Sequence, residues 1–254
     1  MDLFANPLFV IAAVLAVTSL GIAKGGFVGF GVMAVPLLSL VVTPPQAAAI
    51  LLPTLLAQDA FSVTAFRRDF SAWNLKVLLP GVLAGVVLAA LLAASLSVAV
   101  VRLTVGVIAL LFIASRAGGP WLERHLPKPS VTTGLFWGTA AGFTSTLANA
   151  GAPPYQMHML PQRLPKMTFI GTTAIYFAAT NIMKTPAYFA LGQLTWENVS
   201  VGIALIPLAL ATNYLGLWLI RRVSTEAFYR IAYVLIGLIA LELLRGSIVN
   251  LLRG

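Results

Sequence analysis

The stretch Ala23-Lys24-Gly25-Gly26-Phe27-Val28-Gly29-Phe30-Gly31 interrupts the first apolar segment of the chain and places a charged side chain beside the interruption. Glycine costs about 1 kcal/mol per residue relative to alanine inside a helix, so this density of glycine ends a helix. Within a lipid bilayer, a broken backbone must find its hydrogen-bond partners in protein or in a water-filled cavity. A glycine-rich break with a cation therefore predicts part of a solute pathway. Close helix packing through small residues is the alternative interpretation.

A second, weaker break lies at Ala141-Gly142-Phe143-Thr144-Ser145-Thr146-Leu147-Ala148-Asn149-Ala150-Gly151. It also interrupts an apolar segment, but it carries fewer glycines and no cation. Two such breaks, one in each half of the chain, are typical of a transporter that arose by internal duplication.

The composition is that of a polytopic membrane protein. Of the 254 residues, 59% are hydrophobic and 9% are charged, whereas about 25% of the residues in a soluble domain are charged. The net charge of +9 is dispersed over short loops, a pattern that favours membrane orientation over nucleic-acid binding. The chain has no cysteine, which excludes disulfides, thiolate chemistry and cysteine-ligated metals.

The order of apolar segments predicts an all-α fold of two inverted repeats, each with a broken, re-entrant-like helical hairpin followed by three transmembrane helices. We expect repeat 1 at residues 1–116, a polar inter-repeat loop at 117–130, and repeat 2 at 131–254, together forming one transport domain. The apolar runs lie at 7–23, 32–42, 46–66, 75–94, 98–115, 131–149, 155–160, 167–191, 199–220 and 228–244.

The distribution of lysine and arginine supports the inverted arrangement. If each hairpin returns to its starting side, the loops at 43–46, 95–97 and 192–198 share one side of the membrane, and they carry no lysine or arginine. Because cytoplasmic loops are enriched in these residues, both termini are expected on the non-cytoplasmic side. The opposite, basic side holds Arg67, Arg68, Lys76, Arg116, Arg124, Lys128, Arg163, Lys166, Arg221, Arg222 and Arg230.

Few ionisable residues lie at membrane depth, where a charge costs about 2.5–3.5 kcal/mol. Asp59 follows Gln58 in an apolar segment, and we interpret it as a proton-carrying carboxylate or as a gating partner of Lys24. A structural ion pair is the alternative for Asp59. Glu242, three residues before Arg245, is interpreted as half of a local ion pair.

Lys184 lies centrally in a long apolar run, three residues after Asn181, so the two share a helix face. Thr172 adds a hydroxyl group on the same predicted helix. This face is interpreted as an anion-binding surface, with snorkelling of Lys184 toward the interface as the alternative.

Two buried lysines without a matching number of buried acids predict a site for a small anion. Backbone N–H groups at Gly25 and Gly26 would add donors, and no second ligand is spaced to make a metal site with His158. The predicted substrate-binding residues are Lys24, Gly25, Gly26, Asn149, Thr172, Asn181 and Lys184, and the predicted proton-coupling or gating residues are Asp59, Gln58 and His158.

The sequence resembles the TauE/SafE sulfite exporter family over almost the whole chain. At the second break, Thr144, Ser145, Thr146 and Asn149 stand where the family is often richer in glycine, a departure that bears on substrate choice. The motifs that carry the resemblance are 25–31 with 35–38, then Gln162-Arg163-Leu164-Pro165-Lys166, Gly171-Thr172-Thr173-Ala174, Asn181-Ile182-Met183-Lys184-Thr185-Pro186-Ala187-Tyr188-Phe189-Ala190-Leu191-Gly192, and Arg221-Arg222 followed by Phe228-Tyr229-Arg230.

The resemblance implies a secondary transporter of the bacterial inner membrane that moves sulfite, thiosulfate or an organosulfonate, coupled to protons and without a cofactor or enzymatic activity. The expected partners are the small anion, protons and the lipid bilayer, and a homo-oligomer is compatible with the sequence. Two alternatives stay open, namely transport of an unrelated solute such as a metal cation or small metabolite, and a non-transporting membrane assembly protein.

Overall fold

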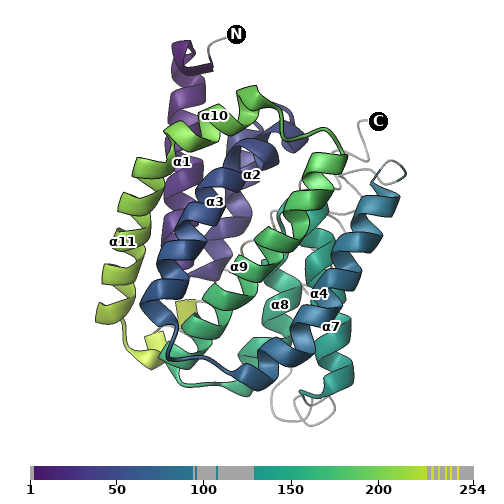
Figure 1. Ribbon diagram of the computed structural model, residues 1–254. Helices are drawn as coiled ribbons and strands as arrows, with labels where there is room; N and C mark the ends of the chain where they lie inside the picture. The colour runs from purple at the N-terminus through teal and green to yellow at the C-terminus, as the bar shows by residue number, and fades with distance from the viewer. Residues whose placement is uncertain are drawn as a thin grey trace. The chain divides into compact units, whose positions relative to one another are not determined.

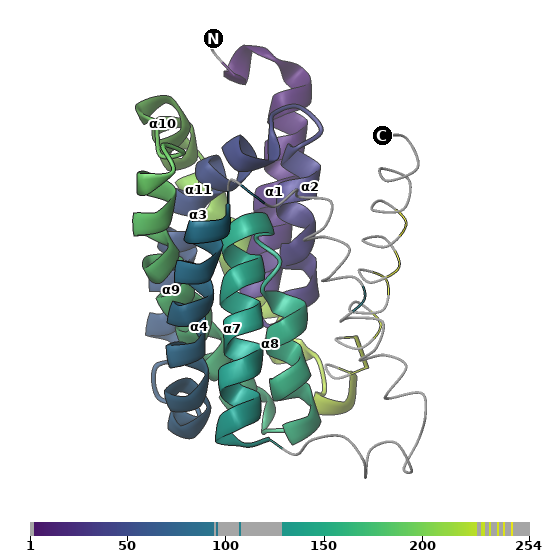
Figure 2. The same ribbon diagram turned by 90° about the vertical axis from the view of Figure 1, so that its right-hand side faces the viewer.

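The computed structural model describes residues 3–93, 95, 107 and 129–227, together with positions 230, 231, 234, 238, 241 and 245. All secondary-structure elements in this part of the chain are helical, as expected (Figures 1 and 2). The predicted spans at 98–115 and 228–244, the polar loop at 117–130 and the proposed pair of Glu242 with Arg245 fall almost entirely outside the described residues.

The chain divides into two compact units, each made of segments that are distant in sequence. The first unit comprises Met1–Ala72 and Lys166–Ser224, and the second comprises Trp73–Pro165 and Thr225–Gly254. Each unit thus combines parts of both predicted repeats. The boundaries of the compact units therefore do not coincide with those of the predicted repeats.

The first unit begins with a long helix that ends at the glycine break. Helix α1 (Pro7–Lys24) starts after Asn6, whose side-chain oxygen accepts a hydrogen bond from the N–H of Leu8 at 3.0 Å, a favourable cap for the helix start. After the break, the 3-10 helix η2 (Val28–Met33) and the short helix α2 (Ala34–Leu38) pack back against α1. A long helix, a break and a shorter returning segment therefore form a hairpin.

Four further helices complete the first unit: α3 (Pro44–Phe66), α9 (Lys166–Ala190), α10 (Trp196–Ala204) and α11 (Ile206–Arg222). Helix α3 lies alongside α9, and α11 lies alongside α1 (Figure 1). The single span expected at 199–220 is instead bent by 48° between α10 and α11. Pro207 explains the bend, because its missing N–H prevents a continuous helix.

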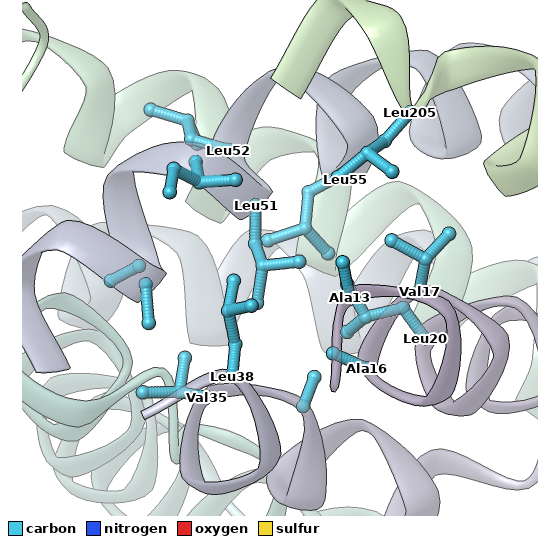
Figure 3. Packing of buried hydrophobic residues seen from close by; sticks show 14 of the residues in the cluster. Ala13, Ala16, Val17, Leu20, Val35, Leu38, Leu51, Leu52, Leu55 and Leu205 are labelled. Atoms are coloured by element: carbon cyan, nitrogen blue, oxygen red, sulfur yellow. The ribbon is translucent and has the colours of Figure 1, made fainter. Parts of the chain in front are cut away.

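The hydrophobic core of the first unit is formed where α1, α2 and α3 meet (Figure 3). Leu20, Leu38 and Leu51 each have at most 3% of their surface exposed. Burying an aliphatic side chain of this size contributes about 1.5–3 kcal/mol. This packing holds the hairpin against α3 and so fixes the position of the glycine break.

The second unit contains the other hairpin. Helix α7 (Val131–Ala148) begins at a capping box between Ser130 and Thr133 and ends at Asn149, which adopts a left-handed conformation with φ of 50°. Helix α8 (Ala152–Met159) returns against α7 and continues into the 3-10 helix η3 (Leu160–Gln162). Helix α4 (Ala72–Leu92) packs closely on α7, since a Cβ at Gly85 would lie 2.1 Å from the carbonyl oxygen of Thr139.

Three described helices, α1, α3 and α4, are long and apolar enough to cross a membrane, and the bent pair of α10 and α11 makes a fourth candidate. Helix α9 has 25 residues but is less apolar, since it carries Asn181 and Lys184 within its length. A helix of this length extends about 37 Å, more than the hydrocarbon thickness of a bilayer. The described part of the chain is thus that of a membrane protein.

Candidate functional site

The centre of the candidate site is an ion pair between Lys24 and Asp59 in the first unit. Lys24 is the last residue of α1, where the negative end of the helix dipole stabilises a cation. Asp59 lies in the C-terminal half of α3 and is bonded through its Oδ1 atom to Lys24 Nζ. The side chains of Lys24 and Asp59 are 10% and 4% exposed, so both charges are largely removed from water.

Helix α9 supplies the second partner of Asp59. The amide nitrogen Nδ2 of Asn181 donates to Asp59 Oδ2 at 2.6 Å, and both residues are buried. Both carboxylate oxygens therefore accept a hydrogen bond, one from a cation and one from an amide. This arrangement compensates the desolvation of the carboxylate and joins α1, α3 and α9 at one point.

Lys184 lies on the same face of α9 as Asn181. Its side chain is 1% exposed, and its Nζ atom lies 5.6 Å from the centre of the Tyr188 ring. The Nζ of Lys24 lies 5.8 Å from the centre of the Phe177 ring. Steps of four, three and four residues along α9 place Phe177, Asn181, Lys184 and Tyr188 in one stripe, in which aromatic faces flank the polar groups. The burial of Lys184 removes the alternative in which it snorkels toward the interface.

Within the described residues, the cluster brings together two lysines and one carboxylate. Lys184 interacts electrostatically with both Asp59 and Lys24. Such a cluster can bind an anion at its ammonium groups, and its carboxylate can hold or release a proton. The contacts of the remaining predicted site residues, which are Gly25, Gly26, Thr172, Gln58, His158 and Asn149, are described next.

The two glycines of the first break are engaged in ending α1. The N–H of Gly25 donates to the carbonyls of Gly21 and Ile22, and the N–H of Gly26 donates to that of Ala23. Gly26 has a φ of 115°, which other residues rarely adopt. The backbone donors expected to face an anion are therefore bonded within the protein, and the alternative interpretation, close packing, describes Gly25 correctly.

Thr172 holds a turn of the first unit. Its hydroxyl accepts from the N–H of Ser71 at 2.8 Å and donates to the carbonyl of Thr168 at 2.6 Å. The neighbouring Gly171 lies so close to the carbonyl oxygen of Asp69 that a Cβ would approach it to 1.9 Å. The Gly171–Thr172 motif thus fixes the chain between α3 and α4.

Gln58 connects α3 to α11. The side-chain Nε2 of Gln58 donates to the main-chain carbonyl of Ala209 at 3.0 Å, and the main-chain carbonyl of Gln58 accepts from Asn213 Nδ2 at 3.0 Å. Asn213 Nδ2 also lies 3.1 Å from Ser62 Oγ. Asn213 was not among the predicted site residues, although an amide side chain within the apolar part of α11 was a usable signal.

His158 and Asn149 belong to the second unit. His158 Nε2 lies 3.0 Å from Asn74 Oδ1, and its ring stacks on Trp73 with 6.0 Å between the ring centres. Asn74 and Gln162 exchange two amide hydrogen bonds of 3.0 and 2.8 Å. This network, which was not predicted from the sequence, joins the start of α4 to the end of α8. Asn149 forms the left-handed end of α7.

The hydroxyls at the second break serve the backbone. Thr144 Oγ1 donates to the carbonyls of Ala140 at 2.8 Å and Ala150 at 3.1 Å, and Thr146 Oγ1 donates to that of Gly142 at 2.8 Å. The bonds to Ala140 and Gly142 are side-chain bonds to the carbonyl four residues earlier within α7, and the bond to Ala150 ties the residue after the helix end back to the helix. The threonines that stand in place of glycine at the second break therefore have a local structural role.

Comparison with known proteins identifies a family for the chain. Neither the comparison with curated proteins nor that with solved structures finds a match. The model of one family, described as sulfite exporter TauE/SafE, matches residues 10–243, a range that contains Lys24, Asp59, Asn181 and Lys184. Because this match covers nearly the whole chain, the protein belongs to the TauE/SafE sulfite exporter family of membrane transporters.

Proposed function

We propose that this protein is a secondary transporter that moves a small sulfur-containing anion, such as sulfite, thiosulfate or an organosulfonate, across the bacterial inner membrane with coupling to protons. The observation that carries the proposal is the buried cluster of Lys24, Lys184, Asp59 and Asn181. In a membrane transporter, buried ionisable groups generally mark the path of an ion or proton.

In this proposal Lys24 and Lys184 bind the anion, and Asp59 carries the proton. Asn181 positions the carboxylate through its 2.6 Å hydrogen bond. An anion suits the site better than a metal cation, because a hard cation requires several oxygen ligands, and the described cluster offers two ammonium groups for one carboxylate.

We further propose that the two halves of the chain are inverted repeats at residues 1–116 and 131–254, with both termini on the non-cytoplasmic side. Two hairpins of similar construction support this idea, since α1 with α2 and α7 with α8 each combine a long helix, a break and a short returning helix. Each hairpin also packs on a helix from the other half through glycines, α1 on α11 and α7 on α4.

Flux measurements on the purified protein in proteoliposomes test the function. We expect Lys24→Gln and Lys184→Gln each to abolish uptake of sulfite, thiosulfate or a sulfonate, whereas Lys76→Gln, which removes an exposed lysine, leaves uptake intact. A thermal-shift screen of sulfur oxyanions, with divalent metal cations as controls, identifies the ligand class. Full flux in both cluster variants, or stabilisation by metal cations alone, would refute the proposal.

The alternative of a non-transporting assembly protein predicts no flux of any tested solute and a stable complex with another membrane protein. An unrelated metabolite as substrate predicts flux that is insensitive to Lys184→Gln. Native mass spectrometry on the detergent-solubilised protein determines whether a homo-oligomer is the transporting form.

A further inference from the structure

One face of α11 is exposed and apolar, and it ends in two arginines. Leu215, Trp218 and Leu219 are 46%, 43% and 36% exposed, and the exposed Arg221 and Arg222 follow them in the last turn of the helix. Residues three or four positions apart share a helix face, so the apolar surface leads directly to Arg222. The opposite face of α11 packs on α1 and α3.

A lysine from another helix supplies donors for the end of α11. Lys166, at the start of α9, donates through Nζ to the carbonyl of Ile220 at 3.2 Å and to that of Val223 at 2.6 Å. The carbonyls of the last helical turn need such partners, and the two arginines of α11 do not provide them here. Among the described residues of the first unit, neither Arg221 nor Arg222 forms an ion pair with a carboxylate.

Trp218 orients the side chain of Arg222. The guanidinium carbon of Arg222 lies 4.0 Å from the centre of the Trp218 ring, within the range of a cation–π contact. A guanidinium group whose face rests on a ring keeps its N–H groups at the edge, where they can donate as a fork to a phosphate. Tryptophan is enriched where the hydrocarbon of a bilayer meets the headgroups. The pair therefore has the chemistry to present phosphate-binding donors at headgroup depth.

We propose that the end of α11 binds an anionic phospholipid, with its phosphate at Arg222 and Arg221 and an acyl chain along Trp218, Leu219 and Leu215. Basic residues at a membrane surface attract anionic lipids, so the charges are complementary. The apolar face favours a lipid over a free anion, because a free anion gains nothing from apolar contact. This surface is separate from the buried cluster of Lys24 and Asp59, and its ligand does not depend on which solute is transported.

A lipid bound at this end of α11 stabilises the folded first unit. The buried face of α11 carries Gly216, whose backbone lies against Gly25 at the end of α1. A ligand that binds only the folded protein raises its stability by mass action. Because the surface exists only when α11 is a formed helix docked on α1, thermal unfolding reports lipid binding as well as direct detection does.

The test uses the unaltered, delipidated protein in detergent, to which phosphatidylglycerol or zwitterionic phosphatidylcholine is added. By native mass spectrometry we expect phosphatidylglycerol to bind about tenfold more tightly, the factor that one charge-assisted contact supplies. We also expect it to raise the melting temperature more than phosphatidylcholine does. Equal binding of the two lipids would overturn the proposal. Stabilisation by inorganic phosphate equal to that by phosphatidylglycerol would also overturn it, since a free anion would then suffice.

Three variants locate the site. We expect Arg222→Gln to lose most of the preference for phosphatidylglycerol, and Arg222→Lys, which keeps the charge but not the planar fork, to lie between Arg222→Gln and the unaltered protein. Arg68→Gln removes the same charge from an exposed position after α3 and is expected to keep the preference. Equal losses in Arg222→Gln and Arg68→Gln would show unspecific attraction to a basic surface and overturn the proposal. None of these outcomes affects the proposed anion transport, which is tested separately by flux.

Discussion

Gly25, which caps the end of α1, lies against the backbone of Gly216 on α11, so closely that a Cβ at Gly25 would be 2.2 Å from the carbonyl carbon of Gly216. Lys24 precedes this contact directly and is bonded to Asp59. The helix end that carries the cation is therefore positioned by an α1–α11 contact that tolerates no side chain. Small residues at such contacts allow helix backbones to approach closely within a membrane.

We expect Gly25→Ala to lower the stability of the protein, because the added methyl group forces α1 and α11 apart. Overpacking of this kind costs about 1–3 kcal/mol. Gly31→Ala is a milder matched comparison, since its Cβ would make a tight contact of 3.2 Å with Ala23 Cβ and would not overlap any backbone atom. Thermal unfolding of the two variants in detergent measures the difference, and equal melting temperatures would contradict the close contact.

The Lys24–Asp59 pair predicts a strong energetic coupling between the two residues. Removing one partner leaves the other charge buried and costs about 3–5 kcal/mol, whereas replacing both by apolar residues is often nearly neutral. Lys24→Met and Asp59→Leu should each destabilise the protein more than the double variant does. A double-mutant cycle of unfolding free energies provides the measurement. Additive effects of the two substitutions would show that the pair contributes no coupling.

His158 is expected to matter for the structure of the second unit. His158→Leu removes the group that bonds Asn74 Oδ1 at 3.0 Å, and weakening a buried hydrogen-bond network costs about 1–3 kcal/mol. We expect a lower melting temperature, with an unchanged pH dependence of flux per folded molecule. If the stability is retained and the pH dependence is lost, the sequence-based assignment of His158 to proton coupling is the correct one.

The absence of cysteine makes the orientation of α9 directly testable. Arg163→Cys and Leu191→Cys place single thiols at exposed positions before and after this 25-residue helix. We expect a membrane-impermeant maleimide to label position 163 from the cytoplasmic side and position 191 from the opposite side. Labelling of both positions from one side would exclude α9 as a single crossing.

Much of the helical structure could be predicted from hydrophobic runs and from glycine and proline positions. The expected segments at 7–23 and 167–191 correspond closely to α1 (Pro7–Lys24) and α9 (Lys166–Ala190). At Pro207 the sequence indicates a kink or a helix end, and the hydrophobic run at 199–220 alone does not reveal the 48° bend that the structure has there. The spacing of apolar residues along a helix predicts which of its faces is buried, but it does not reveal which other helix packs on that face.

The site was predictable to the extent that charge in an apolar segment is rare. Lys24, Asp59 and Lys184 stood out for that reason, and the shared face of Asn181 and Lys184 follows from their spacing. The bond from Asn181 to Asp59 joins residues 122 positions apart, and no local pattern contains that information. Thr172 was selected for its hydroxyl, whose partner Ser71 lies 101 positions away.

The discontinuous composition of the first unit has a consequence for biosynthesis. Helix α11, which covers the glycine face of α1, is synthesised about 180 residues after α1, and at typical translation rates this delay lasts many seconds. During that interval α1 and α3 are inserted without α9 or α11. The Lys24–Asp59 pair needs only the first 66 residues, so it allows both charges to enter the bilayer as a neutral pair before the rest of the protein exists. An early role as an insertion aid would then explain why the cation stands at the end of the very first helix.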